Sequence, residues 1–145
     1  MSERTVTHDT FIIERTYNAA PARVFEAWAD PQAKAKWFPT AQEFDFQVGG
    51  REINRTPVNG TVYLFDATYQ DIVLNERIVY SYIMDRDQTR ISVSQVTVEF
   101  APAGKGTKLT YTEQGIFLDG EDEPKFRFEG TNELLDNLGK TLQDD

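Results

Sequence analysis

The residue best placed to do chemistry in this sequence is a glutamate inside a strongly β-forming segment. Lys108 to Gln114 alternates apolar and polar residues, which predicts a strand. If Leu109 and Tyr111 face the interior, the period of two puts Glu113 on the same face, near the strand's end. A carboxylate there must pair, become neutral or contact water in a cavity. Two interpretations stay open: a rim carboxylate bonded to solvent or an arginine, or a polar group that orients a molecule in a pocket.

Aromatic side chains with alternating spacing form the second candidate. Tyr63, Phe65 and Tyr69 alternate along one predicted strand, and Tyr80 and Tyr82 along the next. All of these rings can be ordinary core. Buried phenols, however, need hydrogen-bond partners, and several tyrosines on one concave face are typical of a pocket of mixed polarity.

Two further clusters have simpler explanations. The segment 104–108, Gly-Lys-Gly-Thr-Lys, has the residue types of a phosphate-binding loop but lacks its spacing and its strand–loop–helix setting, which favours a hairpin turn. The acidic segment from Asp119 to Glu123 lacks the ligand pattern of a calcium loop, so a solvated loop is expected. We predict no metal site and no cofactor.

The elements that position these residues follow from periodicity and turn residues. Expected strands are Phe11–Tyr17, Val62–Tyr69, Arg77–Met84, Ile91–Phe100 and Lys108–Gln114, with a hairpin turn at Asn59-Gly60. A short helix opens at Ala20-Pro21 and stops at Asp30-Pro31, and a second covers about Gln32 to Trp37. Leucines at helical spacing predict a closing helix over Glu129–Leu142.

This order of elements predicts an α+β fold in which one curved antiparallel sheet carries its helices on one face. The expected organisation is a disordered N-terminal tail over residues 1–9 and one domain over residues 10–145.

Composition limits the function classes. The chain has 145 residues, a formal net charge of −9, one histidine and no cysteine. Disulfides, thiolate metal sites, cysteine nucleophiles and a multi-histidine metal site are therefore excluded. An acidic domain is a poor candidate for nucleic acids or anionic membranes. Without a leader sequence or a spanning segment, the expected location is the cytoplasm.

Several short segments, in a fixed order, resemble the heat-shock-protein-90 ATPase activator-like family, part of the START-related (SRPBCC) superfamily that includes birch-pollen-allergen-like domains. The matching residues are Arg15–Pro21, Val24–Trp28, Asp30-Pro31, Trp37-Phe38, Val48–Arg51, Gly106–Thr110 and Glu129-Gly130 through Leu142. The sequence departs from this family at Thr131, where many members carry a bulky aromatic residue, and at Phe38, where relatives often have tryptophan.

The resemblance implies a helix-grip fold, in which six or seven antiparallel strands wrap around the long C-terminal helix and enclose a cavity. The predicted cavity residues are Trp37, Phe38, Tyr63, Phe65, Tyr80, Tyr82, Tyr111, Glu113, Phe117, Leu134 and Leu138.

Three functions are compatible with such a fold. The first is binding of a small apolar or amphipathic molecule in the cavity, with no catalytic residue. The second is contact with a chaperone or another protein, and the third is acid/base cyclisation or hydrolysis that uses Glu113 and a tyrosine. The first is favoured, and the protein is more simply a binder than an enzyme, acting as a monomer or homodimer.

Overall fold

The computed structural model describes residues 4–143. Over these residues the chain forms, in order, β1 (Val6–Tyr17), α1 (Pro21–Ala29), α2 (Pro31–Lys34), β2 (Glu43–Phe44), β3 (Arg51–Val58), β4 (Thr61–Val73), β5 (Arg77–Arg86), β6 (Thr89–Ala103), β7 (Gly106–Leu118) and α3 (Pro124–Gln143).

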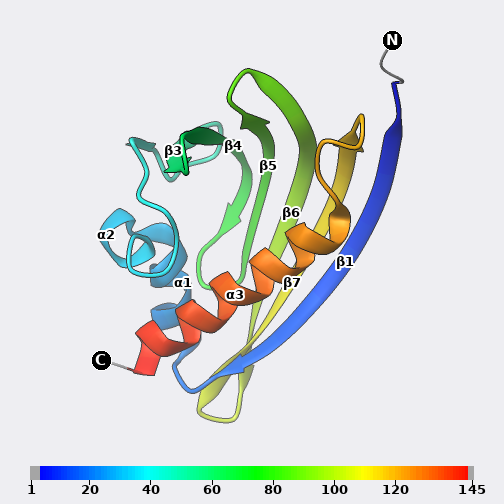
Figure 1. Cartoon of the computed structure of the whole chain (residues 1–145). Helices are drawn as coiled ribbons and strands as arrows, with labels where there is room; N and C mark the ends of the chain where they lie inside the picture. Colours follow the sequence, from blue (N-terminus) through cyan, green and yellow to red (C-terminus); the bar gives the residue numbers. More distant parts are fainter. Residues whose placement is uncertain (1–3, 144–145) are drawn as a thin grey trace.

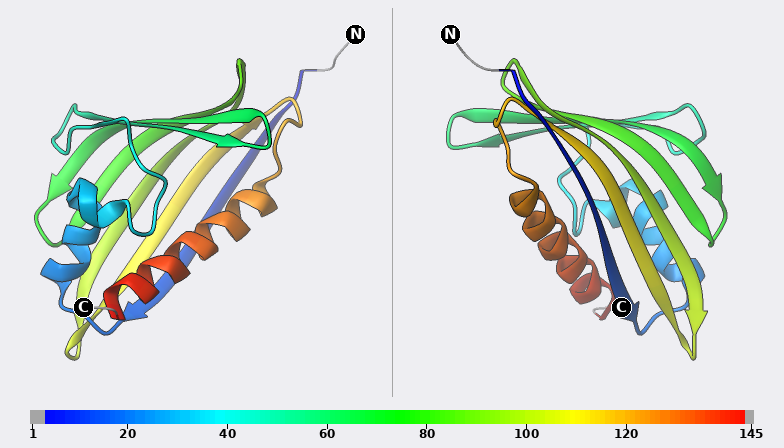
Figure 2. Two further views of the ribbon diagram at one scale, coloured as in Figure 1. Left: turned by 60° about the vertical axis from the view of Figure 1, so that its left-hand side comes forward. Right: turned by 90° about the vertical axis from the view of Figure 1, so that its right-hand side faces the viewer.

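The strands form one antiparallel sheet with the order β1-β7-β6-β5-β4-β3-β2. The sheet curves strongly, and α3 lies diagonally across its concave side (Figure 1). The two side views show α1, α2 and α3 on this same side of the sheet (Figure 2). The predicted α+β helix-grip architecture is therefore confirmed.

Two turns predicted from glycine positions connect neighbouring strands. Asn59 and Gly60 both have positive φ, 52° and 84°, as a type I′ hairpin between β3 and β4 requires. Gly104, with φ 59°, turns the chain between β6 and β7, where Ala103 pairs with Gly106. The lysine-containing glycine segment is thus a hairpin, as predicted, and not a phosphate loop.

The two short helices meet at one residue. Pro21 begins α1, and Asp30 ends it because Pro31 follows. The Asp30 carboxylate then caps α2 by accepting the Ala33 N–H at 2.9 Å. The apolar face of α1, which includes Phe25 and Trp28, is buried against β6 and β7.

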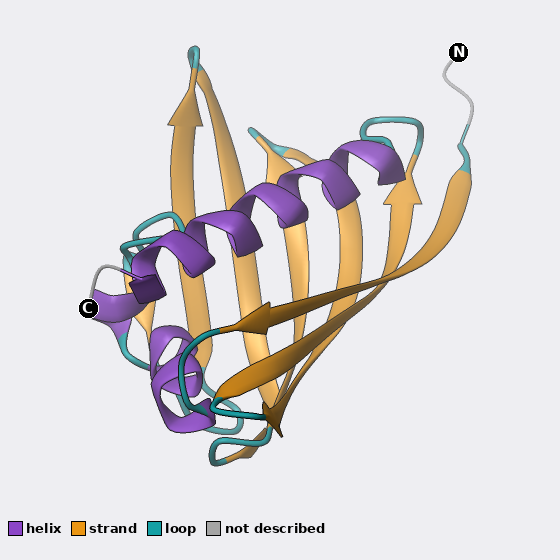
Figure 3. Cartoon of the chain, turned by 90° about the horizontal axis from the view of Figure 1, so that it is seen from below, coloured by secondary structure: helices purple, strands orange, loops and turns teal. Residues whose placement is uncertain are grey.

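The long helix α3 covers the concave side from one end to the other, as the view from below shows (Figure 3). Its leucines Leu135, Leu138 and Leu142 are buried.

Three sequence predictions need correction at the element ends. The helix begins at Pro124 rather than Glu129, because proline is well suited to the first helical turn.

The second correction concerns the N-terminal segment. Disorder through residue 9 is wrong for Val6 to Asp9, because β1 begins at Val6 and pairs with the end of β7 at Leu118. Residues 1–3 lie outside the described part of the chain. The third correction is that β7 runs from Gly106 to Leu118, so Glu113 lies in the middle of a strand and not near its end.

Candidate functional site

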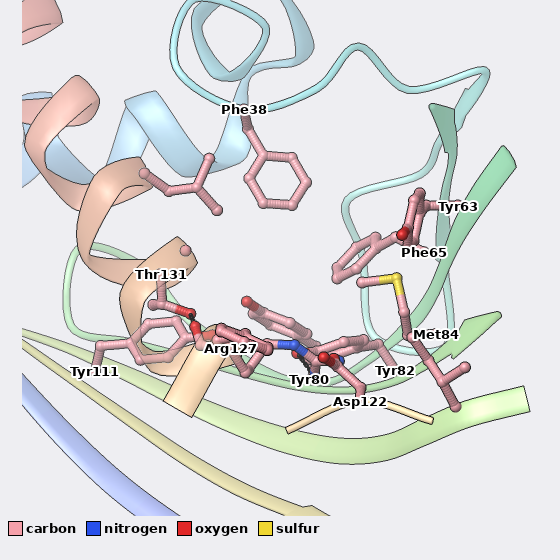
Figure 4. A pocket seen from close by; sticks show the side chains of 14 residues that line it. Phe38, Tyr63, Phe65, Tyr80, Tyr82, Met84, Tyr111, Asp122, Arg127 and Thr131 are labelled. Atoms are coloured by element: carbon pink, nitrogen blue, oxygen red, sulfur yellow. Dashed lines mark hydrogen bonds and ion pairs between the residues drawn. The ribbon is translucent and has the colours of Figure 1, made fainter. Parts of the chain in front are cut away.

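A cavity of about 320 Å³ lies between the concave face of the sheet and α3. This volume falls at the small end of the range of ligand pockets, about 300–1,000 Å³. Side chains from β4, β5, β6 and β7 approach it from the sheet, Phe38 from the segment after α2, and the first half of α3 from the opposite side (Figure 4). The lining residues are Phe38, Tyr63, Phe65, Tyr80, Tyr82, Met84, Ile91, Tyr111, Asp122, Phe126, Arg127, Gly130, Thr131 and Leu134.

Seven of the eleven predicted residues line this cavity: Phe38, Tyr63, Phe65, Tyr80, Tyr82, Tyr111 and Leu134. Four of them alternate along β4 and β5, which is the arrangement that the period of two predicts: Tyr63, Phe65, Tyr80 and Tyr82. Their role in binding remains a prediction.

The other four predicted residues lie outside the lining. Trp37 is held in the core, where its indole N–H donates to the Ala27 carbonyl at 2.9 Å. Leu138 is fully buried in the same core, and Phe117 lies beneath the guanidinium of Arg127, 5.1 Å from its ring centre. Glu113 is the most informative of the four.

The Glu113 carboxylate is buried directly behind the cavity wall, with 1% of the residue exposed. Its Oε1 accepts the Tyr111 hydroxyl at 2.7 Å, and its Oε2 accepts the Tyr82 hydroxyl at 2.7 Å. Arg127 Nη1 lies 3.3 Å from Oε2. The sequence-based prediction of an inward carboxylate is confirmed, and its partner is an arginine.

Arg127 is the centre of this polar wall and projects from the first turns of α3 (Figure 4). Its Nη1 also donates to the Tyr82 hydroxyl oxygen at 2.7 Å. Its Nη2 donates to Ser92 Oγ at 2.8 Å and to Asp122 Oδ2 at 3.2 Å. Only 9% of the Arg127 side chain is exposed. Charge-assisted contacts of this kind offset the cost of burying the guanidinium.

The network shifts the pKa of its phenols. Burial, and then the negative charge of Glu113, raise the pKa of both Tyr82 and Tyr111 well above the ordinary value. Burial lowers the pKa of Arg127, but Tyr82, Glu113 and Asp122 outweigh it, so the net shift is upward. The wall thus consists of neutral phenols and a permanently charged arginine.

Sequence reasoning missed Arg127 because it began the closing helix only at Glu129. The signal was nevertheless present. Pro124 after an acidic segment is a helix start, and the spacing of Arg127, Thr131, Leu135 and Leu138 extends the buried stripe by two turns.

Glu113 is poorly placed to act as a general base on a molecule in the cavity. A general base must come within about 3 Å of the proton that it abstracts. Both Glu113 oxygens already accept phenolic hydroxyls, and Glu113 does not line the cavity. Across residues 4–143, no three His, Cys, Asp or Glu side chains gather in a way that would hold a metal ion.

A second buried ion pair lies beside α2 and was not anticipated. Lys34 Nζ is 2.7 Å from Glu52 Oε1, and the two side chains are 4% and 1% exposed. The Tyr69 hydroxyl donates to the same oxygen at 2.6 Å. The Lys34 ammonium also lies 4.6 Å from the centre of the Phe38 ring, so this pair supports one wall of the cavity from behind.

A sequence profile for the family described as "Activator of Hsp90 ATPase homolog 1-like protein" matches residues 18–143. This span includes α1, α2, α3 and every strand from β2 to β7. The chain belongs to this family. The resemblance seen in the sequence is thereby confirmed.

Solved structures agree with this assignment. An uncharacterised protein from Rhizobium leguminosarum is 42% identical, with a TM-score of 0.94 over 99% of this chain and 100% of its own. A protein from Rhizobium loti is 46% identical, with a TM-score of 0.90 over 94% of this chain and 99% of its own. A Chromobacterium violaceum protein is 28% identical, with a TM-score of 0.84 over 94% and 98% of the two chains. No curated protein sequence matches this chain.

Phe38 and Thr131, the two residues at which the sequence was expected to differ from the family that it resembles, both line the cavity. Phe38 approaches it from the segment after α2, and Thr131 from α3. Thr131 Oγ1 donates to the Arg127 carbonyl at 2.8 Å, so its small side chain stays close to the helix.

Within the described residues, none of the helices combines the length and the apolar character needed to cross a membrane.

Proposed function

We propose that this activator-like domain binds a small hydrophobic molecule in the cavity between its sheet and α3. One observation carries the proposal: about 320 Å³ of space surrounded by aromatic and aliphatic side chains, with the polar groups gathered on one wall. Ligand pockets typically combine such an apolar lining with a few placed polar groups.

Apolar burial supplies the affinity in this proposal, at roughly 25 cal/mol for each Å² removed from water. Phe38, Phe65 and Met84 provide apolar surface, and Leu134 provides it from the helix side. In this proposal the polar end of the ligand faces the wall that contains Tyr80, Tyr82 and Arg127.

Native mass spectrometry of freshly purified protein tests the proposal, followed by thermal unfolding in the presence of lipids, sterols and polyketides. A co-purified molecule, or a higher Tm with one compound class, is the expected result. No bound mass and an unchanged Tm across the whole panel would contradict it.

A variant at Thr131 links binding to the cavity itself. Thr131→Phe places a ring in the cavity and is expected to abolish the Tm increase. Thr131→Val removes only the hydroxyl and keeps the volume, so it should retain that increase. Equal increases in Tm with ligand in the two variants would show that the ligand binds outside this cavity.

Chaperone contact is the second candidate, and the description of the family favours it. Its test is the ATPase rate of a purified Hsp90 with and without this protein. Stimulation that depends on protein concentration and falls with salt would support it, because an acidic surface acts through screened charge. The proposed location for both functions is the cytoplasm.

A further inference from the structure

The net charge of the cavity wall limits the charge that a bound ligand can carry. Among the described residues that line the cavity, Asp122 and Arg127 are the charged ones. Glu113 lies directly behind them and contacts Arg127. Two formal negative charges therefore face the single positive charge of Arg127, which leaves one negative charge in excess.

Arg127 has little left to offer a ligand anion. A guanidinium has five N–H donors. Nη1 donates to Tyr82 and Glu113, and Nη2 donates to Ser92 and Asp122, so the protein occupies all four Nη donors. A ligand carboxylate would have to displace Asp122 or Glu113, each of which would then lose its contact with the cation at a partly or fully buried position.

The aromatic rings that line the cavity also disfavour an anionic ligand. Tyr63, Phe65, Tyr80, Tyr82 and Tyr111 line the cavity, and the faces of aromatic rings are electronegative. These faces attract cations and repel anions. Lys125 Nζ lies 5.6 Å from the centre of the ring of Phe126, which lines the cavity. Lys125 itself is exposed, so salt screens its charge.

We infer that the cavity takes amphiphiles whose polar end is uncharged or cationic, such as an alcohol or an amine, and discriminates against carboxylates of the same shape. This inference rests on the proposed function and deepens it. Asp122 is the specificity residue, because it both supplies the excess charge and occupies Arg127 Nη2.

Three probes that share one alkyl chain test this inference: decanol, decylamine and decanoate, compared by calorimetry or by displacement of an uncharged fluorescent probe at neutral pH. We expect decanol and decylamine to bind at least about tenfold more tightly than decanoate. Equal affinities, or tighter binding of decanoate, would overturn the inference while leaving the proposed function intact. If none of the three binds, the inference is overturned, and the wider panel of lipids, sterols and polyketides decides the proposed function separately.

A matched pair of variants assigns the discrimination to one residue. Asp122→Asn removes the excess charge and should improve the affinity for decanoate relative to decanol by about tenfold. Glu123→Gln makes the same change of net charge at the neighbouring exposed residue, which does not line the cavity, and should leave this ratio as it is. A ratio that changes equally in both variants would show that only the overall charge matters, which contradicts the role of Asp122.

Discussion

Arg127 Nη1 lies 3.3 Å from Glu113 Oε2, and these side chains come from α3 and the middle of β7, respectively. The side chains are 9% and 1% exposed. This pair connects α3 to the sheet beside the cavity, which Arg127 itself lines. The same contact therefore serves both the stability of the fold and the polar character of the candidate site.

Breaking this pair should cost more than an ordinary surface substitution. Arg127→Met leaves Glu113 buried with only phenol partners, and we expect a loss of about 3–5 kcal/mol in the free energy of unfolding. Urea denaturation measures this loss. With Glu113→Gln added, the double variant should lose less than the sum of the two single losses, because contacting residues are coupled. Additive losses would mean that the two residues do not act as a pair.

Stability should fall at alkaline pH. Tyr82 and Tyr111, and by burial also Tyr17, Tyr69 and Tyr80, have pKa values raised above 10 in the folded protein. The folded state then holds more protons than the unfolded state above that pH. The stabilisation is complete below pH 10 and decreases as pH rises above it, by up to about 1.4 kcal/mol per pH unit for each such tyrosine.

Ultraviolet titration at alkaline pH checks this expectation. The absorbance of these tyrosinates should appear together with the loss of circular dichroism, in one transition. Gradual ionisation of several buried phenols at intact secondary structure would contradict the raised pKa values.

The sheet and its turns could be predicted because their determinants are local. Alternation identified β4 to β7, and Asn59-Gly60 identified its hairpin through the positive φ that both residues adopt. Burial of Glu113 followed from the same alternation. Its partner could not be found in this way, because Arg127 reaches Glu113 only after α3 packs on the concave face.

The boundaries of the candidate site also depend on packing between distant segments. Trp37 and Phe38 are adjacent in sequence and both aromatic, but Phe38 lines the cavity whereas Trp37 turns into the core against Trp28, with ring centres 4.7 Å apart. Neither the sequence pattern around them nor their aromatic character distinguishes the two residues. The packing of Trp37 against α1, on the concave side of the sheet, decides which of the two rings is enclosed in the core.

Two glycines of α3 should respond oppositely to alanine. A methyl group at Gly130 meets no atom within 4 Å, so Gly130→Ala should stabilise the helix by about 0.4–1 kcal/mol. At Gly139 the same methyl group would lie 3.2 Å from the Tyr17 ring. That ring is fixed by the hydroxyl of Tyr17, which donates to the Leu135 carbonyl at 2.8 Å. Gly139→Ala should therefore be the less stable of the two variants in thermal unfolding, and the reverse order would show that Tyr17 moves freely.

The buried Lys34–Glu52 pair should matter far more than an exposed pair of the same chemistry. Lys34→Met leaves the Glu52 carboxylate enclosed with Tyr69, so a loss of about 3–5 kcal/mol is expected. Lys108→Met breaks a pair with Glu14 whose side chains are both about half exposed, and should cost less than about 1 kcal/mol. Urea unfolding of both variants gives the comparison. Because Lys34 also contacts the Phe38 ring, Lys34→Met should in addition weaken any ligand response of the cavity. Equal stability losses would show that burial adds nothing to the Lys34 pair.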